Sequence, residues 1–228
     1  MFTWTSERRR PAAALALTMA LAGCLDDGLA LPGLPALFGP AEPPRQTTMA
    51  DGALVLTAPA GYCIDRRRGA PATEGAEVVL LASCAGLGGG DGAPRPIWPA
   101  LLSVSVIDGA TAGDTNPAAL TTFFESAAGR RLLAADGNPD SVGIVGTSLE
   151  DGVFIVHARD IDGAAMPGLG RDRWRAVFQR GGAMVAATVA PISGRRLPDD
   201  AGRALLGELV AAVRPAGGSV TQRPGAGG

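Results

Sequence analysis

Apolar stretches, some alternating with polar residues and some continuous, dominate the middle of the chain and predict β-strands. They cover residues 53–58, 62–64, 77–83, 102–106, 143–148, 153–159, 173–180 and 183–190. In 102–106, leucine and valine alternate with serine, which is typical of a half-buried strand. Asp-Gly at 151–152 and Gly-Gly at 181–182 are turn signals between neighbouring strands. Residues 143–190 are therefore predicted to form an antiparallel meander.

Two further stretches carry the apolar spacing of an amphipathic helix. In the first, 116–133, Asn116 is placed to cap the helix and Pro117 occupies its first turn. The second opens at Pro198 with two aspartates, whose charge favours a helix N-terminus, and continues to residue 213. The order of these elements predicts an α+β fold, an antiparallel β-sheet with two packed helices.

The two ends of the chain lack such patterns and are rich in proline and glycine. We interpret residues 24–50 as a flexible tether and residues 215–228 as a disordered tail. The remaining residues, 51–214, have the length of a single domain. An α+β domain between two irregular ends is the predicted organisation.

The first 23 residues predict a cleaved signal segment. Three arginines, at 8–10, precede an uncharged run that is shorter than the roughly 20 residues needed to span a bilayer. Leu21-Ala22-Gly23-Cys24, which closes the run, resembles the bacterial lipobox. The resemblance implies cleavage before Cys24 and attachment of lipid to its thiol; a secretory signal that releases a soluble protein is the alternative. We therefore expect a lipoprotein of the bacterial cell envelope, facing the periplasm from either the inner or the outer membrane.

The charge of the chain excludes several classes of function. Removing residues 1–23 takes away three arginines and one glutamate, which leaves 17 basic and 21 acidic residues. An acidic chain without a basic face argues against a nucleic-acid partner. All basic residues are arginine, so chemistry that depends on lysine, such as a Walker-type phosphate site or a Schiff base, is excluded.

The chain has three cysteines, an odd number for an exported protein. Lipidation of Cys24 leaves Cys63 and Cys84, and two such thiols outside the cytoplasm are usually oxidised to a disulfide. Two buried free thiols are the alternative. If both cysteines belonged to one plain hairpin they would lie about 20 Å apart, whereas a disulfide requires Cα atoms within about 7 Å. The disulfide thus requires Pro59 to break the first strand.

His157 is the only histidine in the chain. It shares a strand face with Ile155 and Arg159, and no Gly-x-Ser-x-Gly motif is present. We interpret it as a hydrogen-bonded strand histidine; a hydrolase that pairs it with Ser148 or Ser193 is the alternative. A single histidine without a spare thiol also argues against a zinc site. No catalytic, cofactor-binding or metal-ligating set is predicted.

A few surface residues are candidates for contact with a partner. Residues 66–68 are three consecutive arginines in a predicted loop. Such a run can meet anionic headgroups or carboxylates, although it is often only solvated. A second basic cluster is expected at Arg171, Arg173 and Arg175. A loop near residue 168 offers exposed apolar side chains. The candidate contact residues are Arg66, Arg67, Arg68, Met166 and Leu169.

The order of elements resembles the Mog1/PsbP-like layout. The resemblance is carried by 58–62 at the end of the first strand, the helix near Asn116 and the final helix at 201–213. It implies an accessory or assembly module rather than a catalyst. Residues 61–65 together with 81–84 are also similar to a family of short alphaproteobacterial lipoproteins, which implies no particular activity.

The first functional hypothesis is a non-catalytic envelope module, membrane-anchored by lipid, that acts by contact with another envelope protein. The alternatives are a small-ligand binder with a pocket between the sheet and the 116–133 helix, and a serine hydrolase that uses His157.

Overall fold

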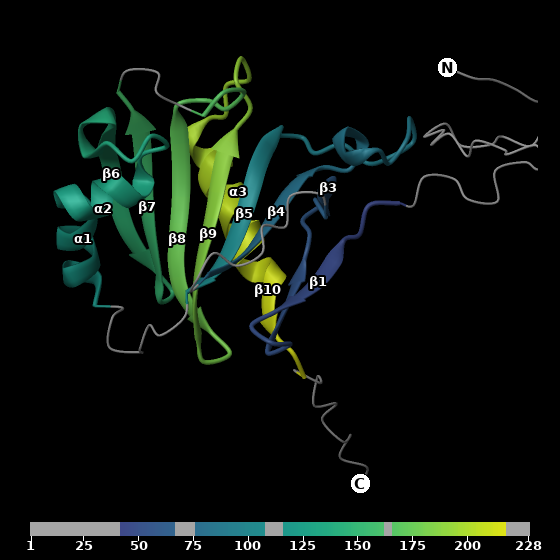
Figure 1. Ribbon diagram of the computed structural model, residues 1–228, viewed down its shortest axis with the longest axis horizontal. Coiled ribbons are helices and arrows are strands. Elements are labelled where there is room, and N and C mark those ends of the chain that lie inside the picture. Colours follow the sequence, from purple (N-terminus) through teal and green to yellow (C-terminus); the bar gives the residue numbers. More distant parts are fainter. Residues whose placement is uncertain (1–41, 67–75, 108–115, 162–165, 218–228) are drawn as a thin grey trace, which may run out of the picture. The chain divides into compact units, whose positions relative to one another are not determined.

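The larger of two sheets contains seven of the described strands, all paired antiparallel (Figure 1). The computed structural model describes residues 42–66, 76–107, 116–161 and 166–217. In spatial order the strands are β3 (Tyr62–Ile64), β4 (Ala76–Ser83), β5 (Ala100–Ile107), β9 (Ala183–Pro191), β8 (Asp172–Arg180), β7 (Val153–Asp160) and β6 (Val142–Glu150). The predicted meander is confirmed, because β6, β7, β8 and β9 are neighbours in chain order. At both predicted turns the glycines adopt positive φ, as two-residue hairpin loops require.

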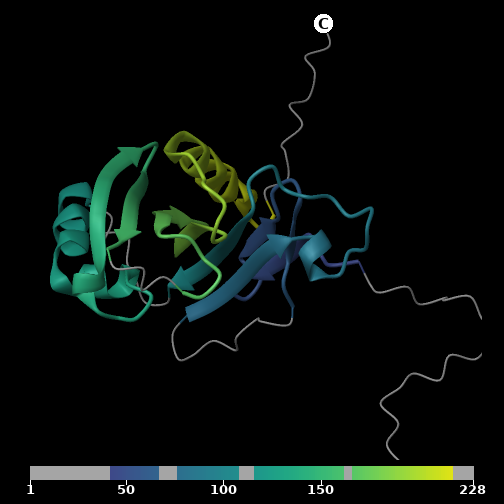
Figure 2. The ribbon, with the colours of Figure 1, turned by 90° about the horizontal axis from the view of Figure 1, so that it is seen from above.

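Helix α3 (Asp199–Ala212) packs on one face of this sheet. Three buried leucines of α3 form one cluster with three side chains of β8. The leucines are Leu205, Leu206 and Leu209, and the β8 side chains are Trp174, Ala176 and Phe178. The opposite face, near β6 and β7, is covered by α1 (Pro117–Glu125) and α2 (Ala127–Leu133) (Figures 1 and 2). The second cluster includes Phe124, Leu133, Val142, Phe154 and Val156. This architecture confirms the predicted α+β class.

The prediction of a single helix over 116–133 is wrong, because the structure divides this segment into two helices at Ser126. Ser126 has an extended backbone, and its hydroxyl accepts a hydrogen bond from the Gly129 N–H at the start of α2. A Cβ on Gly129 would lie 2.1 Å from the Phe123 carbonyl oxygen, so glycine permits this tight corner. The domain therefore has three α-helices in its described part, besides the short 3-10 turns Ala85–Leu87 and Pro139–Ser141.

A second, three-stranded sheet joins the two ends of the domain. Its strands are β1 (Gln46–Met49), β2 (Leu54–Thr57) and β10 (Val213–Pro215), with β2 in the middle. Strand β1 lies within 24–50, where the sequence predicted only a tether. Its sequence, Gln-Thr-Thr-Met, has no apolar alternation, and Met49 is its one fully buried residue. Pairing with β2, rather than a buried face of its own, makes this segment a strand.

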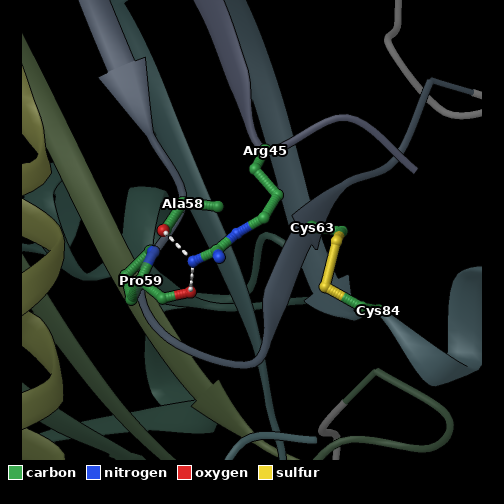
Figure 3. Close-up of a disulfide and its surroundings, with 5 residues drawn as sticks. All are labelled: Arg45, Ala58, Pro59, Cys63 and Cys84. Atoms are coloured by element: carbon green, nitrogen blue, oxygen red, sulfur yellow. Dashed lines mark hydrogen bonds between the residues drawn. A yellow bond between two sulfur atoms is a disulfide. The ribbon is translucent and has the colours of Figure 1, made fainter. Parts of the chain in front are cut away.

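The predicted disulfide between Cys63 and Cys84 is confirmed, with Cα atoms 4.8 Å apart (Figure 3). Strand β3 pairs with the end of β4, so Cys63 lies opposite Ala82 and close to Cys84. The predicted break at Pro59 sends β2 and β3 into different sheets, and the plain hairpin is excluded. The Arg45 guanidinium donates to the carbonyls of Ala58 and Pro59, at 3.2 and 3.5 Å, and holds this corner.

Several predicted features lie outside the described residues: the signal segment with Cys24, most of the tether, Arg67 and Arg68, and the tail from residue 218. Of the helices that the structure describes, none combines the length and apolar character needed to cross a membrane.

Candidate functional site

A cavity of about 770 Å³ opens where β7 ends and β8 begins. Its walls come from β7, from residues 166–172 and from the loop 191–199 that leads into α3. Hydrogen bonds from Gly170 N to Pro191 O (2.7 Å) and from Ser193 N to Gly168 O (2.8 Å) join the two loops. We call this site the loop-end cavity.

His157 forms part of the wall of the loop-end cavity and is 5% exposed. It lies directly opposite Trp174 in the β7–β8 register, and the two rings stack with centroids 4.7 Å apart. Its Nε2 is 2.9 Å from Asp172 Oδ1, and its Nδ1 is 3.0 Å from Asp199 Oδ1. The interpretation of His157 as a hydrogen-bonded strand histidine is therefore confirmed, and the side chain is buried.

The two carboxylates that flank His157 have further partners. Asp172 Oδ1 also accepts a hydrogen bond from Arg159 Nε, at 2.8 Å. Asp199 Oδ1 accepts from Trp174 Nε1 at 2.9 Å, and its Oδ2 lies 3.4 Å from Arg203 Nε. The Trp174 hydrogen bond, followed by the nearby His157 and Arg203, holds the pKa of Asp199 below its ordinary value.

Close packing of α3 brings Asp199 to His157. Gly202 faces the Trp174 indole so closely that a Cβ would lie 2.5–2.6 Å from three ring atoms. Asp199 stands less than one turn earlier on the same helix, so the helix can approach the sheet closely enough for its carboxylate to reach the imidazole.

This arrangement does not support a Ser–His pair. Each ring nitrogen of His157 faces a carboxylate oxygen, which leaves no nitrogen free to take a proton from serine. Ser148 instead bonds to Glu150 (3.1 Å) and Arg203 (3.3 Å). Ser193 lines the loop-end cavity, but within the described part of the chain its hydroxyl makes no hydrogen bond to His157.

Four arginines line the loop-end cavity, against two aspartates. Arg159 pairs with Asp172, and Arg171 donates to the backbone carbonyls of Asp160 and Ile161. Arg195 and Arg196 are exposed, and in the region covered by the structure neither guanidinium group has a hydrogen-bond or ion-pair partner. The cavity is thus positively charged in a chain whose overall charge is negative.

The structure brings some of the predicted contact residues together and separates others. Met166, 53% exposed, and the half-buried Leu169 both line the loop-end cavity. Arg66 is exposed but lines a different hollow, beside Pro43 and Ile64. The role of these residues in contact remains a prediction.

The predicted basic cluster at 171, 173 and 175 is wrong as a surface feature. Arg173 pairs with the buried Asp160, and Arg175 Nε donates to Thr188 Oγ1 at 3.1 Å. Burial, followed by the nearby Arg173, lowers the pKa of Arg175. Of the three arginines, Arg171 alone lines the loop-end cavity.

The alternative hypothesis of a small-ligand binder placed its pocket between the sheet and the 116–133 helix. A hollow of about 510 Å³ does lie beside β6, lined by Glu125, Arg130 and residues 142–147. The larger loop-end cavity was not predicted. Asp172 could have been found from the β7–β8 register, which places it opposite Arg159, two residues from Trp174, whereas nothing local indicates Asp199, Arg195 or Arg196. Within the described ranges, no three His, Cys, Asp or Glu side chains are arranged to hold a metal ion.

Asp199→Asn should lower stability in a pH-dependent way. Because the folded-state pKa of Asp199 is below its usual 3.8, its contribution is complete above that value and is lost as the pH falls through the folded-state pKa. Its exposed position limits the effect to less than about 1 kcal/mol. Urea unfolding from neutral to strongly acidic pH should show the two proteins converging at low pH. Asp200→Asn is the matched control, and the same convergence with that variant would dismiss the Asp199 contacts as the cause.

No protein-family model and no curated protein matches the chain. It is similar in structure to the cyanobacterial PsbP protein CyanoP from Synechocystis sp. PCC 6803, with 13% identity, a TM-score of 0.44, and coverage of 75% of this chain and 91% of that one. A structure from Bacteroides thetaiotaomicron VPI-5482 is also similar, with 10% identity, a TM-score of 0.32, and coverage of 75% and 48%. At these identities the likeness concerns the fold alone.

Proposed function

We propose that this protein is an exported, lipid-anchored module of the bacterial envelope that acts by binding and not by catalysis. The lipobox-like sequence at Cys24 supports the anchor. One structural observation supports action by binding without catalysis. Carboxylates hold both ring nitrogens of His157, the only histidine, beside an open cavity that is lined with arginines. The loop end, meaning the loops 94–99, 166–171 and 191–198, is the proposed binding surface, and another envelope component is the proposed partner.

The anchor predicts a specific effect of Cys24→Ser. Without the thiol no diacylglyceryl group can be attached, so the variant should lose all incorporation of a fatty-acid probe. Metabolic labelling followed by immunoprecipitation measures this loss. Equal labelling of the wild type and the variant would contradict the anchor.

The absence of catalysis predicts how His157→Ala behaves. The variant should lose about 2 kcal/mol of unfolding free energy, because Asp172 and Asp199 lose their shared partner and Trp174 loses its stacked ring. Hydrolysis of a panel of generic esters should be at background for both proteins. Hydrolysis by the wild type that disappears in a still-folded variant would instead establish the hydrolase.

A small-ligand binder is the second candidate, and the size of the loop-end cavity favours it. At about 770 Å³ the cavity lies within the roughly 300–1,000 Å³ that ligand sites occupy. Native mass spectrometry of protein purified from membranes tests it. A retained small molecule that is lost in Arg195→Ser/Arg196→Ser supports this candidate, and apo protein alone argues against it.

A further inference from the structure

Exposed apolar side chains surround the loop-end cavity. Ile97 is 88% exposed, Met166 53%, Trp98 38% and Ile192 37%. Met166 and Ile192 line the cavity itself, and Ile192 N donates to Pro99 O at 3.1 Å, which places the loop of Ile97 and Trp98 alongside. Large apolar side chains grouped at one end of a domain mark a surface that is covered in use.

The loop that carries Ile97 and Trp98 is held firmly in place. The buried Tyr62 hydroxyl donates to the Trp98 carbonyl. Gly61 has positive φ, and a Cβ there would lie 2.4 Å from Pro96 N, so the backbones of the two segments touch. The exposed apolar side chains are therefore presented by a fixed backbone, so ordering them on binding costs little.

Positive charge accompanies these apolar side chains. Arg171, Arg195 and Arg196 line the cavity without a carboxylate partner in the described part of the chain. The two aspartates of the cavity repel an incoming anion only weakly, since Asp172 is paired with Arg159 and Asp199 with Arg203. The cavity is therefore suited to a phosphate group, which arginine binds through its guanidinium N–H donors.

We propose that the loop end docks on an anionic phospholipid surface, with a headgroup phosphate in the cavity among Arg171, Arg195 and Arg196. Ile97 and Trp98 then enter the interfacial region, where indole rings are favoured. A soluble phosphate compound would account for the arginines but would leave the apolar side chains exposed. Juxtamembrane arginines each strengthen such binding about fivefold.

Docking rests on the proposed anchor, because the anchor holds the domain near lipid. Residues 25–41 separate Cys24 from the described domain, and at 3.3–3.6 Å per residue they reach at most about 60 Å. The anchor therefore keeps the domain within that distance of the membrane.

The experiment reconstitutes the mature lipidated protein in vesicles that contain phospholipids with brominated acyl chains. Bromine on the acyl chains quenches tryptophan only at close range, so it reports a ring that reaches the boundary between headgroups and acyl chains; the mature chain retains Trp98 and the buried Trp174. Quenching is expected in vesicles of equal parts phosphatidylglycerol and phosphatidylcholine, and little is expected in phosphatidylcholine alone. Trp98→Phe should remove the quenched signal.

Paired variants decide the role of the arginines. Arg195→Ser/Arg196→Ser should lose the quenching, whereas Arg131→Ser, an exposed arginine of α2 on the other face of the sheet, should retain it. Circular dichroism confirms that the variants are folded. Trp98 that stays unquenched in both vesicle types, or quenching that survives the double substitution, overturns the docking. Fatty-acid labelling of the same sample reports separately on the anchor; if it is negative, the unlipidated chain is added to the vesicles from solution and the same quenching decides.

Discussion

Replacing Gly202 with alanine is expected to lower the unfolding free energy by about 3 kcal/mol, the upper end of what overpacking usually costs. The new Cβ would lie 2.5–2.6 Å from three atoms of the Trp174 ring. Trp174 is 1% exposed and stacked on His157, so it cannot move aside. Helix α3 must shift outward instead, and Asp199 would be drawn away from Trp174 and His157. Urea unfolding measures the loss.

Gly207 on the same helix is the matched control. It is exposed, and a Cβ there would meet nothing within 4 Å. Gly207→Ala should therefore raise stability by up to about 1 kcal/mol, because alanine has the higher helix propensity. If the two variants changed stability equally, contact between α3 and Trp174 could not be what positions the helix.

Loss of the disulfide is expected to cost about 3 kcal/mol in the double variant Cys63→Ala/Cys84→Ala. The bond closes a loop with a sequence separation of 21, and opening that loop raises the chain entropy of the unfolded state. It also fixes β3 against β4, on the far side of the Pro59 corner from β2. The free energy of unfolding, from urea titration without reductant, gives the difference.

Reductant is the control for the disulfide. It should lower the stability of the wild type toward that of the double variant and leave the double variant unchanged. Cys63 and Cys84 are 0% and 2% exposed, so reduction has to be completed under unfolding conditions before refolding. A wild type that is as stable after reduction as before would show that the bond contributes nothing.

Local patterns were sufficient to predict the meander and the role of His157. The strand alternation and the turn signals at 151–152 and 181–182 set the register of β6 with β7 and of β8 with β9. The pairing of β7 with β8, which neither turn connects, places Trp174 opposite His157 and Asp172 opposite Arg159. A strand histidine that shares a face with Ile155 and Arg159 followed from side-chain alternation alone.

The features that were missed depend on contacts between distant segments. Strand β1 exists because it pairs with β2, and its own residues show no strand pattern. Asp199 reaches His157 through the packing of α3 on Trp174, which no spacing in the sequence encodes. The break at Ser126 is a local signal, since serine caps α2, but the apolar spacing that continues through it concealed the corner.

The arginines also show that local patterns do not predict contacts between distant segments. Arg171, Arg173 and Arg175 occupy alternate positions just before and at the start of β8, and they were expected to form a basic cluster. Interior partners hold Arg173 and Arg175, namely the Asp160 carboxylate and the Thr188 hydroxyl. The positive cavity instead combines Arg171 with the 191–198 loop, two segments that only the fold brings together.

Site-specific photocrosslinking in cells tests most directly whether the protein works by contact through its loop end. A photoreactive amino acid at Met166 is compared with one at Leu132, an exposed apolar residue of α2 that is outside the cavity. The account predicts an adduct with an envelope lipid or protein at Met166, its loss in Arg195→Ser/Arg196→Ser, and none at Leu132. An adduct at Leu132 with none at Met166 would contradict it.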